Sequence, residues 1–168
     1  MTALARMSVG VVVERSKAQS AWADFLWRPI AVLPGAPDIE PWTAMQEGDG
    51  STTFYAGPAE LLLHPSETSH YRDNLATGEP KLWIVLRPTG SEPAFAVVCV
   101  TADGSEGEGF TSAGEDIVEP VPMPDVIRLA IDAFVAEHHI EQVFHKRERK
   151  RADLDALGRR ERNSGDKK

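Results

Sequence analysis

Cysteine is nearly absent from this chain: Cys99 is the only one among 168 residues. One cysteine cannot form an internal disulfide, and it excludes the zinc sites that are built from pairs of cysteines. No run approaches the roughly 18 apolar residues that a membrane-spanning helix needs. Residues 1–10 lack the charged start, apolar run and small-residue cleavage site of a secretion signal. Together these absences predict a cytoplasmic protein.

The chain also lacks the signatures of cofactor binding and of catalysis. Residues 103–114 are rich in glycine, but they match neither a dinucleotide fingerprint nor a phosphate-binding loop. Asp103, Glu106 and Glu108 would repel a phosphate there. Cys99 lies in an alternating strand, which favours a buried thiol over a nucleophile. No catalytic residue and no cofactor are therefore expected.

Basic side chains are scarce in residues 1–145, whereas they outnumber acidic ones in residues 146–168, and the total charge is −8. Residues 1–145 carry 8 basic and 21 acidic side chains, a net charge of −13. Residues 146–168 carry 10 basic and 5 acidic side chains, a net charge of +5. This asymmetry predicts a flexible N-terminus at 1–7, a single domain at 8–145 and a basic, partly disordered tail at 146–168.

What is present is enough apolar sequence for a core, with 42% hydrophobic residues. β-Branched and alternating patterns predict strands at 8–14, 25–33, 52–55, 60–64, 81–86, 95–101 and 117–121. Helical patterns cover 66–77 and 124–140, whereas residues 34–50 and 103–114 are expected to form loops, or in the second case a poor helix. The fold class predicted is α+β. It would be a mostly antiparallel sheet of about six or seven strands, with one long C-terminal helix and one shorter helix packed on it.

Two regions are candidates for partner binding. Trp42 lies in the long 34–50 loop, where an exposed indole could anchor an interface. The second region is the basic stretch formed by Lys146, Arg147, Arg149, Lys150 and Arg151. It could contact an acidic protein partner or nucleic acid, or it could simply be the solvated end of a helix. Nucleic acid is the least favoured partner because the acidic body would repel it.

Histidine and glutamate gather between residues 137 and 145. On a continuous helix, His138, Glu141 and His145 would share a face, and such ligands suit zinc or iron. One helix rarely supplies a complete site, so His64 or His70 would have to join. The alternative is a polar helix end with one packed histidine.

Several segments, in this order, carry a family resemblance: Val9–Arg15, Trp27–Gly35, Phe54–Gly57, Tyr71–Leu75, Gly114–Glu119, Val121–Pro124, Phe134–His139 and Phe144–Arg147. Over about residues 8–150 the chain resembles an uncharacterised proteobacterial protein family, a domain of unknown function. The genes of that family cluster with those of formate dehydrogenase and its chaperone. The resemblance implies a role in the assembly, maturation or regulation of that enzyme, and it implies no activity.

Two hypotheses of different class follow. The first is a non-catalytic accessory or interaction protein whose partner is formate dehydrogenase or its maturation factors. The second is a metal- or small-molecule-binding enzyme that uses the 137–145 cluster. Metal content separates the two.

Overall fold

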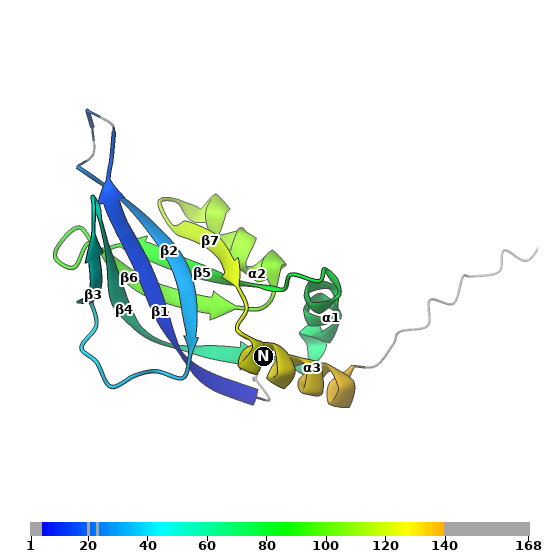
Figure 1. The fold of residues 1–168 in the computed structure, drawn as a ribbon. Coiled ribbons are helices and arrows are strands. Elements are labelled where there is room, and N and C mark those ends of the chain that lie inside the picture. Colours follow the sequence, from blue (N-terminus) through cyan, green and yellow to red (C-terminus); the bar gives the residue numbers. More distant parts are fainter. Residues whose placement is uncertain (1–4, 20, 23, 140–168) are drawn as a thin grey trace, which may run out of the picture.

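The computed structural model describes residues 5–19, 21–22 and 24–139, and the fold is built on two antiparallel sheets (Figure 1). The first sheet has the order β2-β1-β4-β3, and the second has the order β6-β5-β7. The strands of the first are β1 (Ala5–Lys17), β2 (Phe25–Pro34), β3 (Thr43–Gly48) and β4 (Ser51–Leu63). Those of the second are β5 (Lys81–Pro88), β6 (Phe95–Thr101) and β7 (Ile117–Pro122).

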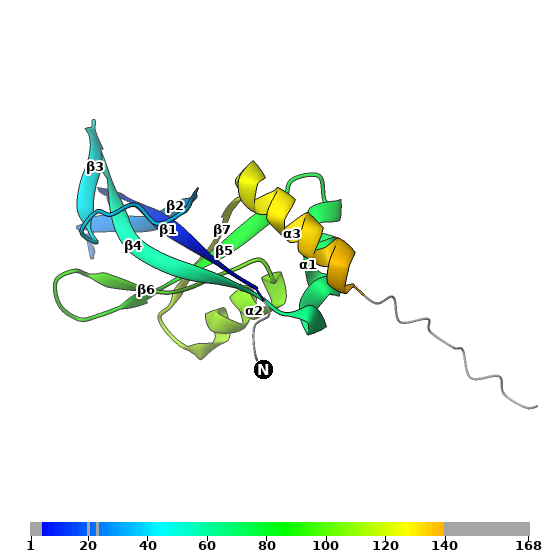
Figure 2. The ribbon, with the colours of Figure 1, turned by 90° about the horizontal axis from the view of Figure 1, so that it is seen from below.

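Three short helices complete the described fold. They are α1 (Thr68–Ala76), which follows a 3₁₀ turn at Pro65–Glu67, α2 (Gly104–Gly109), which runs into a 3₁₀ turn at Phe110–Ala113, and α3 (Asp125–His138). Helices α1 and α3 pack against each other at one end of the sheets, whereas α2 lies against β5 and β6 (Figure 2). Within the described ranges, no helix is long and apolar enough to cross a membrane.

The core lies between the inner faces of the two sheets and the buried side of α3. β4 lies beside β6 and β2 beside β7, without pairing, so that the two sheets face each other. Alternate residues of the central strands point inward and are almost fully buried, among them Val11 and Val13 of β1 and Ile84 of β5. From α3, the side chains of Ile127 and Ile131 enter the same core.

The α+β class is confirmed, but the predicted arrangement of the elements is wrong in two respects. The seven strands form two sheets of four and three strands instead of one sheet. Helix α3 has 14 residues and ends at His138, because His139 leaves the helix in an extended conformation (φ −73°, ψ 120°). The described residues therefore contain no long C-terminal helix.

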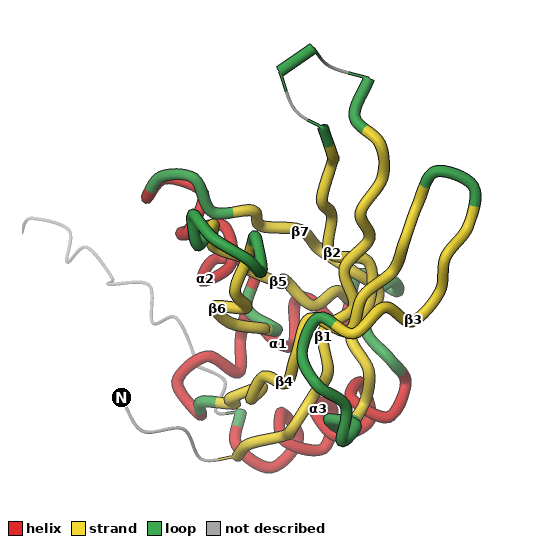
Figure 3. The backbone as a smooth tube through the Cα atoms, turned by 90° about the vertical axis from the view of Figure 1, so that its left-hand side faces the viewer, coloured by secondary structure: helices red, strands yellow, loops and turns green. Residues whose placement is uncertain are grey.

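Two local predictions also need correction. The break expected between strands 52–55 and 60–64 is a β-bulge within the continuous strand β4, where Gly57 takes a φ of +131°. The expected 34–50 loop contains β3, which pairs with the first half of β4 (Figure 3). β3 pairs only with residues 51–55 of β4, so beyond residue 55 the side of β4 away from β1 has no strand partner. Pro58, which has no backbone N–H to donate, is tolerated on this open side.

Candidate functional site

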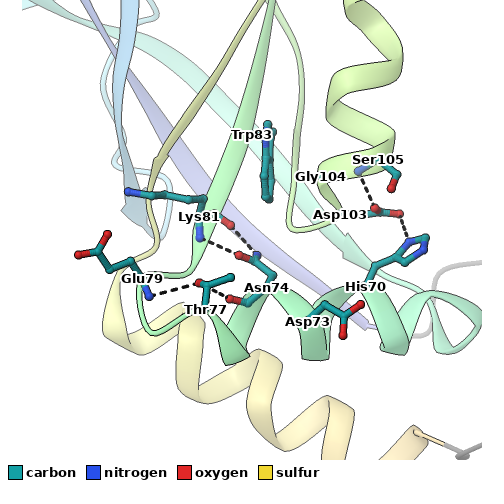
Figure 4. Close-up of a pocket in the computed structure, with 10 residues that line it drawn as sticks. All are labelled: His70, Asp73, Asn74, Thr77, Glu79, Lys81, Trp83, Asp103, Gly104 and Ser105. Carbon is teal, nitrogen blue, oxygen red and sulfur yellow. Dashed lines mark hydrogen bonds and ion pairs between the residues drawn. The ribbon is translucent and has the colours of Figure 1, made fainter.

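A cavity of about 520 Å³ opens between α1, the start of β5 and the start of α2 (Figure 4). Helix α1 contributes His70, Asp73 and Asn74, and β5 contributes Lys81 and Trp83. The remaining side is formed by residues 103–105, which lead from β6 into α2. An aromatic wall with several polar groups converging on it is the usual composition of a small-ligand site.

Asn74 holds the base of this cavity together. Its side chain is buried and donates hydrogen bonds from Nδ2 to the carbonyl oxygens of Lys81 (2.8 Å) and Ala102 (3.1 Å). Its Oδ1 accepts a hydrogen bond from the backbone N–H of Lys81 (2.9 Å). One amide thus fixes α1 to β5 and to the end of β6, which keeps the cavity open at a defined width.

Trp83 forms the wall because α2 packs directly on its ring. Leu82 and Ile84 point into the core, so alternation along β5 places Trp83 on the outer face of the sheet. A Cβ atom added to Gly107 would lie 2.6 Å from Cβ of Trp83, and one added to Gly104 would lie 2.8 Å from Cζ2 of its ring. The glycines therefore let the helix backbone approach the indole closely.

At one corner of the cavity, Nδ1 of His70 lies 3.0 Å from Oε2 of Glu67 and 3.0 Å from Oδ2 of Asp103. We call these three residues the His70 corner. The hydrogen bond with Asp103 is the main cause that raises the pKa of His70, and the negative charges of Glu67 and Asp73 add to it.

Asp103 is the most enclosed member of the corner, since its side chain is only 7% exposed. Its Oδ1 accepts a hydrogen bond from the backbone N–H of Ser105 (3.0 Å), so it also caps α2. Its own N–H donates to Oγ1 of Thr101 (3.1 Å), which in turn donates to Oε2 of Glu106 (2.9 Å). These contacts fix the carboxylate with Oδ2 turned toward His70.

A second feature is a group of half-buried aromatic rings around Trp27, which lies on β2 of the four-stranded sheet. Its ring centroid is 5.9 Å from that of Trp42, 5.9 Å from that of Phe54 and 5.8 Å from that of Phe95. The guanidinium of Arg15 lies over Phe25 (4.5 Å) and over Phe54 (5.0 Å). We call these the aromatic surface, formed by Arg15, Phe25, Trp27, Trp42, Phe54 and Phe95.

Trp42, which the sequence indicates as a partner-binding residue, belongs to this surface. It is half buried and has a φ of +68°, a left-handed conformation that is uncommon for a residue other than glycine. Its backbone N–H donates a hydrogen bond to the carbonyl oxygen of Tyr55, and this contact holds the start of β3 against β4. The indole is therefore fixed in place by the backbone and by Trp27.

The remaining predicted partner-binding residues, Lys146, Arg147, Arg149, Lys150 and Arg151, lie outside the described residues. The same holds for Glu141 and His145 of the predicted metal cluster. That cluster stays a prediction.

His138 and His139 do lie in the described part. The ring of His138 packs on Phe134 at a centroid distance of 4.6 Å. His139, just past the end of α3, contacts Oγ1 of Thr68 (3.0 Å) and Nη1 of Arg72 (3.2 Å), so it ties α3 to α1.

Cys99 is half buried, and the pKa of its thiol is raised rather than lowered. Burial raises its pKa to about 11, with further increases from the charges of Glu106 and Asp116. At neutral pH the thiol therefore stays protonated.

The sequence does not indicate the His70 corner as a unit. The sequence marks His70 as a possible contributor to a metal site and Asp103 as a charge that opposes a phosphate, and it gives no chemical role to Glu67. The signal in the sequence is weak: His70 and Glu67 are three residues apart at a helix start, and Asp103 comes two residues after the end of β6. Only the fold shows that the end of β6 meets α1.

Comparison with known families matches residues 8–149 to a family described as protein of unknown function (DUF3305). The match covers most of the chain, so the protein belongs to this family. Searches of curated proteins and of solved structures give no match.

Proposed function

We propose that this protein is a non-catalytic accessory protein that binds a protein partner through the aromatic surface. The observation that carries this proposal is the set of half-buried rings around Trp27, with the guanidinium of Arg15 between Phe25 and Phe54. Tryptophan and arginine are the residues that most often contribute large binding energies at protein interfaces.

The surface is also arranged in advance for binding. Each ring contacts at least one other ring or the guanidinium of Arg15, so little side-chain freedom remains to be lost on association. Phe25 is the most exposed ring of this surface, with 43% of its area accessible to water. A partner would remove this apolar area from water, a change worth roughly 25 cal/mol per Å².

We propose formate dehydrogenase or one of its maturation factors as the partner, and the cytoplasm as the place where they meet. The support is the family resemblance in the sequence and the single cysteine of the chain. The basic stretch at 146–151 is a second contact in this proposal. Its positive charge would steer an acidic partner toward the protein.

The test compares two neighbouring substitutions on β2. Phe25→Ser removes an exposed ring of the aromatic surface, whereas Leu26→Ser removes a 61% exposed side chain that alternation places on the opposite face of the strand. Each tagged variant is used to purify formate dehydrogenase from the native host. Affinity is then measured with the purified enzyme by biolayer interferometry.

We expect Phe25→Ser to weaken the complex by about 5- to 30-fold, which corresponds to about 1–2 kcal/mol for an interface aromatic. Leu26→Ser should leave the affinity unchanged. Equal affinities for the wild type and Phe25→Ser would exclude the aromatic surface. Failure of the wild type to bind the enzyme or its maturation factors would exclude the proposed partner.

A further inference from the structure

We propose that the His70 corner is a binding site for one divalent transition-metal ion, with Glu67, His70 and Asp103 as its ligands. This site differs from the 137–145 cluster that the sequence suggests. It shares no residue with the aromatic surface, and it lies where α1 meets the start of α2 (Figure 4). It is therefore independent of the proposed partner.

The distances in the corner favour an ion. The three ligand atoms lie within 4.8 Å of one another. Nδ1 of His70 is 3.0 Å from one oxygen of each carboxylate. Two ligand atoms 3.0 Å apart subtend an angle of about 90° at an ion that is about 2.1 Å from each, the angle of octahedral coordination.

Within the part of the chain that the structure describes, the negative charges in the corner are not balanced by basic side chains. A ring nitrogen carries one proton at most, and here two carboxylates compete for it. Asp73 adds its charge to the same histidine, and Glu106 is linked to Asp103 through Thr101. Among the described residues, His70 is the one basic group within ion-pair distance of Glu67 or Asp103. A divalent cation would neutralise this excess more completely than a proton does.

Two of the three ligands are already held in position. Asp103 is nearly enclosed, and Ser105 and Thr101 fix its orientation. His70 projects from the first turn of α1, which Asn74 ties to β5. Glu67 is the longest and most adjustable ligand, and it needs only a side-chain rotation to close on an ion.

The ligand types and the surroundings narrow the choice of metal. An imidazole nitrogen suits zinc, iron, cobalt or nickel better than magnesium or calcium, which prefer oxygen ligands. Three protein ligands leave coordination positions unfilled, and His70 and Asp103 both line the cavity. Water or a small molecule in the cavity could therefore complete the coordination of the ion.

Isothermal titration of the full-length protein, after removal of metals with a chelator, tests the proposal. Zn²⁺, Co²⁺ and Mg²⁺ are added separately to the wild type and to His70→Ala, Glu67→Gln and His138→Ala. Glu67→Gln is the variant least able to disturb the fold, because this side chain makes no capping hydrogen bond. Circular dichroism confirms that each variant is folded.

We expect one equivalent of Zn²⁺ or Co²⁺ to bind and Mg²⁺ to bind more weakly. His70→Ala and Glu67→Gln should each lower the affinity at least 10-fold, the minimum loss typical of altered metal sites. His138→Ala should leave it unchanged. The proposal is overturned if no saturable uptake occurs, or if His138→Ala removes the uptake while the other two variants keep it.

Discussion

Replacement of Gly107 by alanine tests the packing of α2 on Trp83 most directly. On an open helix this change would stabilise the protein, since alanine is favoured over glycine by about 1 kcal/mol in a helix interior. Here the new Cβ would lie 2.6 Å from Cβ and 2.8 Å from Cγ of Trp83. The position of Cβ is set by the backbone of β5, so no rotation of the Trp83 side chain can relieve the 2.6 Å contact.

The gain in helix propensity raises the free energy of unfolding and the steric clash with Trp83 lowers it, and the clash is the larger effect. Overpacking a well-filled site costs about 1–3 kcal/mol, and a 2.6 Å contact lies at the upper end of that range. After the helix gain, Gly107→Ala should lower the free energy of unfolding by about 2 kcal/mol, or the melting temperature by about 6 °C for a chain of this size. Gly109→Ala is the matched control, because a Cβ there meets nothing within 4 Å. It should be neutral or stabilising by up to about 1 kcal/mol.

Gly104→Ala supplies a second, sharper comparison. Its nearest contacts are with ring atoms of Trp83, at 2.8 Å from Cζ2 and 3.0 Å from Cη2. Leucine at position 83 lacks those atoms but keeps Cβ and Cγ. In double-mutant cycles, Trp83→Leu should therefore offset part of the cost of Gly104→Ala and none of the cost of Gly107→Ala.

Urea unfolding followed by circular dichroism measures these differences, since it does not depend on the fluorescence of Trp83. The reasoning is refuted if Gly107→Ala is as stable as the wild type, or if Gly107→Ala and Gly109→Ala have the same stability. Either result would mean that α2 does not approach the indole as closely as described.

Three further predictions concern single side chains. Asn74→Ala removes three hydrogen bonds of about 1 kcal/mol each, so it should lower the free energy of unfolding, measured by urea titration, by about 3 kcal/mol. A smaller loss would show that the amide does not make all three hydrogen bonds. The thiol of Cys99 should react slowly with iodoacetamide at pH 8 and faster as the pH approaches 11, whereas rapid native-state labelling at pH 8 would contradict its raised pKa. The bidentate pair with Arg87 lowers the pKa of Asp116, so it stabilises the fold above about pH 4 and this contribution is lost as the pH falls through the lowered value. The difference in melting temperature between the wild type and Arg87→Ala should accordingly shrink below pH 4, and a difference that does not depend on pH would exclude this ion pair as its cause.

The glycine-rich segment shows where sequence reasoning stops. Helix propensity correctly marks residues 103–114 as poor helix, yet α2 forms there. The helix is possible because Gly104 and Gly107 face Trp83, which is about 20 residues earlier in the chain. Propensity describes a residue and its neighbours, so it contains no information about a partner on another element.

The arrangement of strands has a similar explanation. Apolar alternation predicts six of the seven strands, but it does not say which strand pairs with which. Thr43–Gly48 has little β propensity and becomes a strand because the tight turn after it returns the chain along β4. The two-sheet packing depends on contacts between β4 and β6 and between β2 and β7, none of which leaves a local pattern.

The candidate site was predictable only in its parts. His70 and Trp42 are marked by residue type, since histidine and tryptophan are common in functional sites. The amide of Asn74 and the carboxylate of Asp103 gain their roles from burial against distant strands. A polar residue in a helix or after a strand is usually solvated, so the sequence does not distinguish Asn74 or Asp103 from other polar residues as a member of a site.

The strand orders imply a sequence of events during synthesis. In each sheet the strand that is made first becomes an interior strand: β1 lies between β2 and β4, and β5 lies between β6 and β7. One neighbour is the next strand in the chain, β2 for β1 and β6 for β5, and it is synthesised soon afterwards. The other neighbour, β4 or β7, emerges from the ribosome much later, and β7 is complete only at residue 122. Until then one edge of β5 has unpaired backbone groups and can pair with another nascent chain. A chain that stops before Ile117 would keep that edge open permanently and should aggregate.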